Sequence, residues 1–289
     1  SIFLFIYAFH MPLFIFISGY FHSEKNITKK IIFYTSLGFL YKIFSFIVDR
    51  INGDTRFIFT LLSDGGLAWY IFVLAIYTLA LSLLKDQNKK FILIASIILA
   101  CFVGYDKSIG DFLYLSRTII FFPFYILGTM MQSFDILEFK RKYPLLKVVA
   151  LLIFVAWGIL CITKVDTLYG LRYIFSGRHP FPDGIISFGP IVRLACYTIS
   201  ALLCISLILI TTSRKIKWIS DFGKNTINVY FWHYHLFYLI RPFIDFNKVF
   251  SSFSFGFIAY AIATIVVTVI LSTKIFIFPV NIIRKQIFT

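Results

Sequence analysis

Charged residues, and acidic residues above all, are scarce in this sequence of 289 residues. Asp, Glu, Lys and Arg make up 14% of it, with only 13 acidic side chains, whereas an ordinary globular domain has about 25% charged residues. Apolar residues fill 60% of the chain, and the mean hydropathy is +0.88. A soluble fold of this size has too little interior to bury so much apolar surface. The composition therefore predicts a membrane protein with several spanning segments and excludes most soluble enzymes.

Several familiar site motifs are also absent. There is no Gly-rich phosphate loop and no Gly-x-Ser-x-Gly nucleophile elbow. The four cysteines lie inside apolar stretches without Cys-x-x-Cys spacing, so we expect neither a disulfide nor a metal site. His233 and His235 would point about 200° apart on a helix, which disfavours a shared metal. Carboxylates are almost missing from the apolar runs, which argues against a transporter driven by carboxylate-coupled ions.

Long apolar runs divide the chain into about nine candidate transmembrane helices. A spanning helix needs about 20 apolar residues, and the runs are continuous instead of alternating as in a β-barrel. The runs cover residues 2–22, 31–49 (interrupted by Lys42), 67–84, 91–105, 117–134, 145–163, 190–212, 226–241 and 252–273. We predict an all-α, polytopic membrane helix bundle that forms one domain over residues 1–289. The stretch with Pro279, Arg284 and Lys285 is predicted to be an interfacial tail.

The net charge of +15 indicates a membrane orientation and not nucleic-acid binding, because the basic residues lie in short loops between apolar runs. Of the 28, 17 fall in the first, third, fifth and seventh connections and the tail, and 10 fall in the other connections. The excess marks the cytoplasmic side, which places the C-terminus there and Ser1 outside. We therefore expect one further helix before Ser1, and a location in a bacterial-type plasma membrane.

Polar residues gather in the outer half of the predicted spans. Ionisable groups at such depths are costly and are functional candidates by default. The residues are His10, Trp69, Tyr70, Arg117, Arg193, His233 and His235. Pro12 removes a backbone donor close to His10 and is expected to kink the helix there. Together they predict a polar cavity that opens outward. The alternative is an aromatic belt for Trp69 and Tyr70, arginines that reach the head groups, and an interfacial His235.

Four segments occur in the same order in one known family. Residues 9–20 read FHMPLFIFISGY, residues 68–74 read AWYIFVL, residues 117–128 read RTIIFFPFYILG, and residues 223–233 read GKNTINVYFWH. The first resembles the second-helix signature of the acyltransferase-3 family of membrane O-acyltransferases, in the style of its fucose 4-O-acetylase-like branch. The others resemble its Trp-aromatic third-helix start, its Arg…Phe-Phe-Pro-Phe…Gly segment and its Val-Tyr…His helix. Together they cover nearly the whole chain.

The resemblance implies about ten helices in the intact protein and transfer of an acetyl group from cytoplasmic acetyl-CoA, a co-substrate, to the hydroxyl of a cell-surface or lipid-linked sugar. The family's best-known catalytic His lies at the end of a first helix that this chain lacks, so we expect His10 to orient that base or act as a second one. Arg117 would stabilise negative charge, and His233 would add a hydrogen bond. No metal is implied.

The remaining candidates are assigned to ligand binding. Trp69 and Tyr70 could stack on a sugar ring, while Arg193 and Tyr230 would contact the substrate. Lys29 and Lys30, which are predicted to be cytoplasmic, could meet CoA phosphates, although ordinary positive-inside lysines explain them as well. The rival functions are a transporter or flippase of polyprenyl-linked sugars and a glycan polymerase, for which residues 164–189 with Arg172, Arg178 and His179 could form the external loop.

Overall fold

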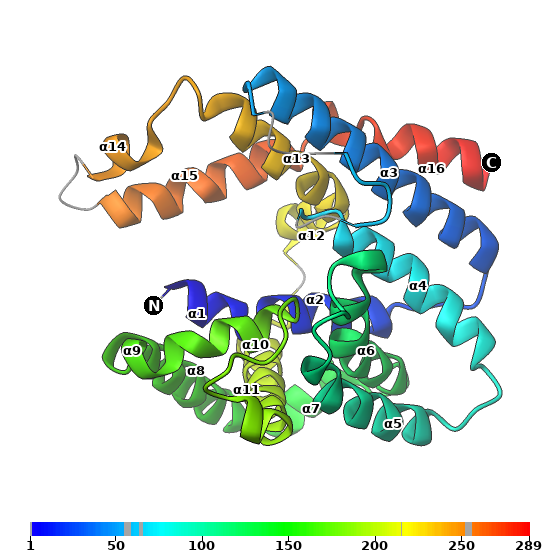
Figure 1. Ribbon diagram of the computed structural model, residues 1–289, viewed down its shortest axis with the longest axis vertical. Coiled ribbons are helices and arrows are strands. Elements are labelled where there is room, and N and C mark those ends of the chain that lie inside the picture. Colours follow the sequence, from blue (N-terminus) through cyan, green and yellow to red (C-terminus); the bar gives the residue numbers. More distant parts are fainter. Residues whose placement is uncertain (1, 55–58, 64–65, 215, 252–255) are drawn as a thin grey trace. The chain divides into compact units, whose positions relative to one another are not determined.

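The computed structural model describes residues 2–54, 59–63, 66–214, 216–251 and 256–289, and the longer regular elements in these ranges are all α-helices (Figure 1). The helices are α1 (Ile2–Tyr7), α2 (His10–Tyr20), α3 (Ile27–Ile51), α4 (Trp69–Leu83), α5 (Lys89–Phe102), α6 (Leu115–Met130), α7 (Ile136–Lys142), α8 (Leu146–Thr163), α9 (Val165–Leu168), α10 (Arg172–Ser176), α11 (Gly189–Ile210), α12 (Lys217–Gly223), α13 (Thr226–Ile240), α14 (Phe246–Ser251), α15 (Gly256–Leu271) and α16 (Val280–Phe288). The predicted all-α class is confirmed.

Among the residues that the structure describes, five helical segments are long and apolar enough to cross a membrane. They are Ile2–Tyr20, Ile27–Ile51, Phe112–Met130, Leu146–Thr163 and Ile186–Ile210. Two further apolar helices, Trp69–Leu83 and Ile258–Leu271, are shorter. Each predicted run contains a helix, but the predicted count of about nine spanning helices is not confirmed. The shortfall arises because α4, α5, α13 and α15 have 14 to 16 residues, fewer than the about 20 that a full span needs.

The chain forms two compact units. Unit 1 comprises residues 1–27, 62–65 and 76–213, and unit 2 comprises residues 28–61, 66–75 and 214–289. In unit 1, α2 packs closely on α6, α8 packs on α11, and α5 packs on both α6 and α11. A buried cluster in this unit includes Leu4, Trp157, Ile174, Phe181 and Leu203.

Two glycines allow the close approach of α2 and α6. A Cβ atom on Gly128 would lie 2.1 Å from the Phe16 carbonyl oxygen, and one on Gly19 would lie 2.1 Å from that of Tyr125. Both separations are far inside van der Waals contact, so only glycine fits at this crossing. Small residues at such positions are the usual means by which membrane helices pack closely.

In unit 2, α3 packs against the start of α4, α13 and α16. Its core includes Phe33, Leu37 and Tyr41 of α3 together with Phe231 of α13 and Val280 of α16. The C-terminal tail, predicted to be interfacial, forms α16, and its Arg284 guanidinium lies 5.7 Å from the Phe33 ring centre.

Lys42 lies in the middle of α3, which continues through it without interruption. Its side chain is 4% exposed, and its ammonium group donates hydrogen bonds to the carbonyl oxygens of Thr60 and, at 3.0 Å, Leu61. A buried ammonium without partners would be very costly, and these carbonyls supply them. Lys42 therefore ties the segment after α3 to the helix.

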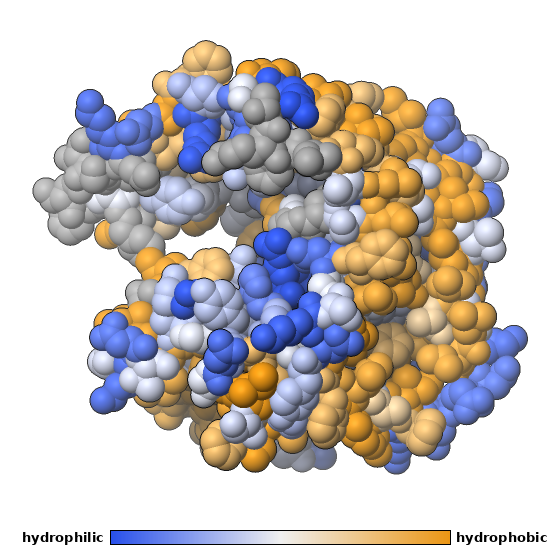
Figure 2. All heavy atoms as spheres, viewed as in Figure 1, coloured by the Kyte–Doolittle hydropathy of each residue, from blue (hydrophilic) through white to orange (hydrophobic). Residues whose placement is uncertain are grey.

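Large apolar side chains remain exposed along the outer faces of several helices. On α8 they include Val148, Leu152, Val155, Ile159 and Ile162, each at least 49% exposed. Figure 2 shows wide hydrophobic areas on the face that it displays. Patches of this extent are rare on soluble monomers and suit contact with lipid, which agrees with the predicted membrane location.

Candidate functional site

His10 begins α2 at a break in the first apolar segment, as the position of Pro12 predicted. Residues 8 and 9 form a turn between α1 and α2. Pro12 has no N–H group, so it cannot donate the helical hydrogen bond to the Ala8 carbonyl, four residues before it. The Ser200 hydroxyl of α11 donates a 2.5 Å hydrogen bond to that carbonyl instead. The break is therefore satisfied by a neighbouring helix, and it leaves His10 at the first position of α2.

The imidazole of His10 is held in one tautomer. Its Nδ1 lies 3.1 Å from the Ile6 carbonyl oxygen, which can only accept, so Nδ1 carries the proton. Nε2 of the neutral ring then has a free lone pair, which is what a general base needs. The side chain is half-buried, and its ring lies 4.8 Å from that of Tyr7.

Arg117 is buried, at 7% exposure, in the first turn of α6. The Ser116 hydroxyl donates a 2.8 Å hydrogen bond to the Gly177 carbonyl, which fastens this turn to the end of α10. Arg178, the next residue, pairs with Asp111 at 2.8 Å. Burial lowers the pKa of His179, and the charges of Arg178 and Arg117 lower it further against the pull of Asp111. Arg117 thus belongs to a cationic cluster at this end of unit 1.

Arg193 is almost fully enclosed, at 1% exposure, near the start of α11. Its Nη1 donates a 2.6 Å hydrogen bond to the Ile174 carbonyl of α10, and its guanidinium lies 5.4 Å from the Phe181 ring. These contacts hold α10 against α11. The predicted role in substrate binding stays a prediction, while the observed contacts are structural.

Four predicted residues lie together in unit 2, on α4 and α13. The Tyr70 and Tyr230 rings are 5.3 Å apart, Trp69 lies 6.1 Å from Tyr70, and His233 lies 5.8 Å from Tyr230. Tyr230 donates its hydroxyl proton to the Leu67 carbonyl, which fixes the start of α4 on α13. The His233 side chain is exposed, and its Nδ1 donates to the Val229 carbonyl at 3.0 Å, which leaves Nε2 as an acceptor.

His235 lies two residues after His233 in α13 and has a different setting from it. It is 0% exposed, its Nδ1 donates to the Phe231 carbonyl at 2.5 Å, and its Nε2 lies 3.0 Å from the Ser45 hydroxyl of α3. The sequence left open that His235 lies at the membrane interface, whereas the structure buries its side chain inside unit 2. This histidine joins α13 to α3 inside unit 2.

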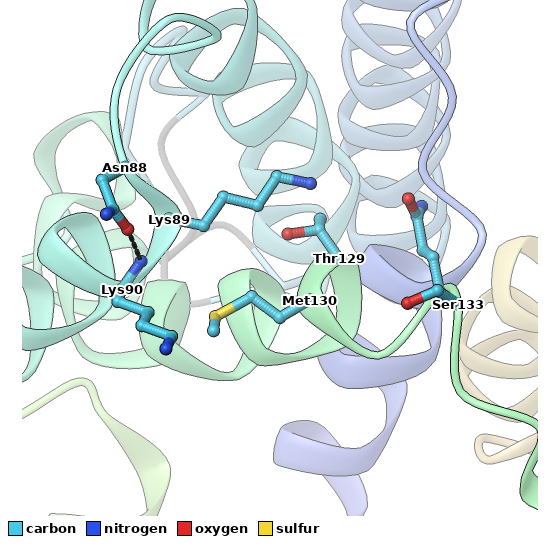
Figure 3. A pocket seen from close by; sticks show the side chains of 7 residues that line it. Asn88, Lys89, Lys90, Thr129, Met130 and Ser133 are labelled. Carbon is cyan, nitrogen blue, oxygen red and sulfur yellow. Dashed lines mark hydrogen bonds between the residues drawn. The ribbon is translucent and has the colours of Figure 1, made fainter.

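Two adjoining cavities lie at the end of unit 1 where α2 and α6 end and α5 begins. The larger measures about 450 Å³, and its wall includes Asn88, Lys89, Lys90, Thr129, Gln132 and Ser133. The smaller measures about 260 Å³, and its wall includes His22, Glu24, Leu81, Lys85, Lys89 and Gln132. Figure 3 shows the Lys89 side chain extended across the larger cavity towards Thr129. Lys29 and Lys30, in the first turn of α3, line neither cavity.

His22, Gln132 and the lysines of these cavities are not among the residues that the sequence predicted for the site. Nδ1 of His22 lies 2.9 Å from the Tyr125 hydroxyl, and the Gln132 amide donates to the His22 carbonyl at 2.6 Å. One signal was available: the chain has only five histidines, and His22 directly follows the apolar run of residues 9–20. No local sequence pattern, however, indicates that the segments near residues 22–24, 84–90 and 129–133 lie close together.

Metal ligands do not cluster in the part of the chain that the structure describes. No group of three or more His, Cys, Asp or Glu side chains could hold an ion among those residues, and the four cysteines are buried and unbridged. Unit 1 offers the His10 imidazole with its Nε2 lone pair, the buried Arg117 guanidinium and the lysine-rich double cavity, and unit 2 offers the His233 imidazole. These groups suit proton transfer and anion binding.

Comparison with known families decides the class. The family model described as an acyltransferase domain, of the acyltransferase-3 type, matches residues 1–273. This chain belongs to the acyltransferase-3 family. The match covers all four segments that suggested the resemblance, and it supports a membrane acyltransferase over the transport and polymerase alternatives. Searches of curated proteins and of solved structures gave no match.

Proposed function

We propose that this membrane acyltransferase moves an acetyl group from cytoplasmic acetyl-CoA to a hydroxyl of a cell-surface or lipid-linked sugar, as expected for the fucose 4-O-acetylase-like branch. The observation that carries the proposal is the family match over residues 1–273. The protein would lie in a bacterial-type plasma membrane with its C-terminus in the cytoplasm. The lipid bilayer and the acceptor glycan would be its partners.

His10 is assigned to proton transfer. Its Nε2 lone pair would accept the proton of the sugar hydroxyl while the hydroxyl oxygen bonds to the thioester carbonyl carbon. The carbon–sulfur bond then breaks, and the imidazolium returns the proton to the CoA sulfur. The hydrogen bond from Nδ1 to Ile6 supports this role because it fixes the required tautomer. His233 of unit 2, whose Nε2 is also an acceptor, is assigned a hydrogen-bonding role.

Arg117 is assigned to charge stabilisation. The thioester oxygen gains negative charge as the acceptor attacks, and a buried guanidinium is strongest where water is excluded. Its 7% exposure supports this assignment. Arg193 would bind substrate only if its enclosed guanidinium becomes accessible.

The aromatic cluster of unit 2 is assigned to the acceptor. Tyr70 and Tyr230 are half-buried rings of the kind that pack on sugars, and the buried Trp69, at 6% exposure, supports them from behind. Ring distances of 5.3 Å (Tyr70–Tyr230) and 6.1 Å (Trp69–Tyr70) make one continuous aromatic group. The hydrogen bond from Tyr230 to Leu67 would keep that group in place.

Transfer of radiolabelled acetyl groups tests the proposal. Membranes that contain the native-length protein are supplied with labelled acetyl-CoA and a total cell glycan pool. Label should enter the glycan, and His10→Ala should reduce the rate at least ~10²-fold if His10 does proton chemistry. Lys142→Gln, an exposed change away from both cavities, should retain wild-type activity. Wild-type turnover in His10→Ala would refute the role of His10. No label with any acceptor, from a folded protein, would refute the proposed function.

A further inference from the structure

The double cavity of unit 1 is strongly basic. Lys85 comes from the short connection between α4 and α5, and Lys89 and Lys90 are the first two residues of α5. Glu24 is the one carboxylate among the described residues that line the double cavity. None of these lysines forms an ion pair with another residue that the structure describes. Three ammonium groups along two adjoining cavities, of which Lys89 lines both, produce a positive field that water does not fully cancel at short range. The cavity therefore favours an anion.

The size and the remaining walls narrow the class of anion. The larger cavity, of about 450 Å³, lies within the range of about 300–1,000 Å³ that small-molecule pockets have. It carries amide and hydroxyl groups of Asn88, Thr129, Gln132 and Ser133, which suit a ribose or a base. The smaller cavity carries an apolar wall of Leu81, Leu84 and Ile92. A ligand with several phosphates and an uncharged arm matches the basic and polar wall of the larger cavity and the apolar wall of the smaller one.

We propose that the double cavity binds the nucleotide end of the acyl donor. The phosphates of CoA would lie among Lys85, Lys89 and Lys90, and the uncharged pantetheine arm would follow the apolar wall of the smaller cavity. Lys binds phosphate as a point charge, so several lysines can serve a ligand with phosphates on two sides. This inference rests on the proposed function, and it relocates the donor contacts from Lys29 and Lys30 to the beginning of α5.

The connections that meet here also agree with a donor from the cytoplasm. Residues 22–24, 84–90 and 129–133 lie in, or at the span ends beside, the first, third and fifth connections, which the distribution of basic residues assigns to the cytoplasmic side. An anionic lipid head group has related chemistry and could also reach that level. The experiment therefore separates CoA from lipid.

The test measures the affinity of the purified native-length protein for CoA, for dephospho-CoA, which lacks the 3′-phosphate, and for ATP. The Lys89→Gln/Lys90→Gln double variant should bind CoA at least about tenfold more weakly, the effect of losing one good charged hydrogen bond. Wild type should prefer CoA over dephospho-CoA, and this preference should shrink in the variant. Lys142→Gln/Lys147→Gln, an equally basic and exposed pair outside the cavities, should bind CoA as wild type does.

Three results would overturn the inference. One is wild-type CoA affinity in Lys89→Gln/Lys90→Gln combined with a loss in Lys29→Gln/Lys30→Gln, which would return the donor site to the start of α3. Another is binding of phosphatidylglycerol vesicles that is lost in Lys89→Gln/Lys90→Gln and that free CoA does not compete away, which would make the cavity a lipid site. The third is equal affinity for ATP and CoA. In each case acetyl transfer by wild type would continue, so the proposed function would stand or fall separately.

Discussion

Substitution of Gly128 by alanine should separate α2 from α6. The new Cβ would lie 2.1 Å from the Phe16 carbonyl oxygen and 2.7 Å from the Tyr20 nitrogen. Since an ordinary C···O contact is about 3.3 Å, the helices must move apart by about 1.2 Å at this point. A gap of that size forfeits a quarter to a half of each dispersion contact, and over ~40 atom pairs the loss is about 2–3 kcal/mol. Overpacked cores show costs of the same order.

Reversible unfolding in mixed micelles measures this cost as the change in the free energy of unfolding. Gly158→Ala on α8 is the matched control, because its Cβ would meet only Phe5 Cε2, at an ordinary 3.6 Å. That control should gain about 0.5–1 kcal/mol, since alanine is the better helix former. Equal stability of Gly128→Ala and wild type would refute the packing argument. Thr129, which lines the larger cavity, follows Gly128 directly, so the variant should also bind CoA less well.

Three further outcomes are expected in the same stability assay and in limited proteolysis. Lys42→Met should expose the segment at residues 59–61 to protease, because the Thr60 and Leu61 carbonyls lose their donor, while a wild-type cleavage rate would contradict the proposed anchoring. His235→Ala should lose about 2–3 kcal/mol through a cavity and an unsatisfied Ser45 hydroxyl, against little change for His233→Ala. Burial and nearby arginines lower the pKa of His179 in the folded protein below its ordinary value of 6.5. The folded state therefore favours the neutral imidazole, and the resulting stability is fully present above pH 6.5 and is lost as the pH falls through the lowered pKa. His179→Gln should therefore lose less stability than wild type between pH 7 and pH 5, and an identical loss would exclude His179 as the titrating group.

The helices could be predicted from the sequence because apolar runs of this length have few other structures in a membrane. The break beside His10 was also predictable, since a proline removes a specific hydrogen bond. The partner of the broken bond was not: Ser200 lies 192 residues from Ala8, and only tertiary packing brings them together.

The candidate site was less predictable than the fold. Trp69, Tyr70, Tyr230 and His233 lie together in unit 2, where a hydrogen bond from Tyr230 to Leu67 that no sequence motif indicates fixes the start of α4. The predicted cavity also included His10, Arg117 and Arg193, which belong to unit 1. Sequence reasoning could not distinguish Lys29 from Lys89, because both are basic residues in loops assigned to the same side. The structure distinguishes the two lysines, because Lys89 lines both cavities and Lys29 lines neither. These cavities form where segments that are distant along the chain come together.

The interruption between α1 and α2 also bears on bilayer thickness. Neither a helix of 6 residues nor one of 11 can cross about 30 Å of hydrocarbon at 1.5 Å per residue, so the two must span it jointly. When the bilayer becomes thicker or thinner, a helix pair adjusts most easily by changing its tilt at an existing kink. Here that kink adjoins His10, so the depth of the imidazole should respond to acyl-chain length. Turnover measured in lipids of different chain length would then vary even where substrate affinity does not.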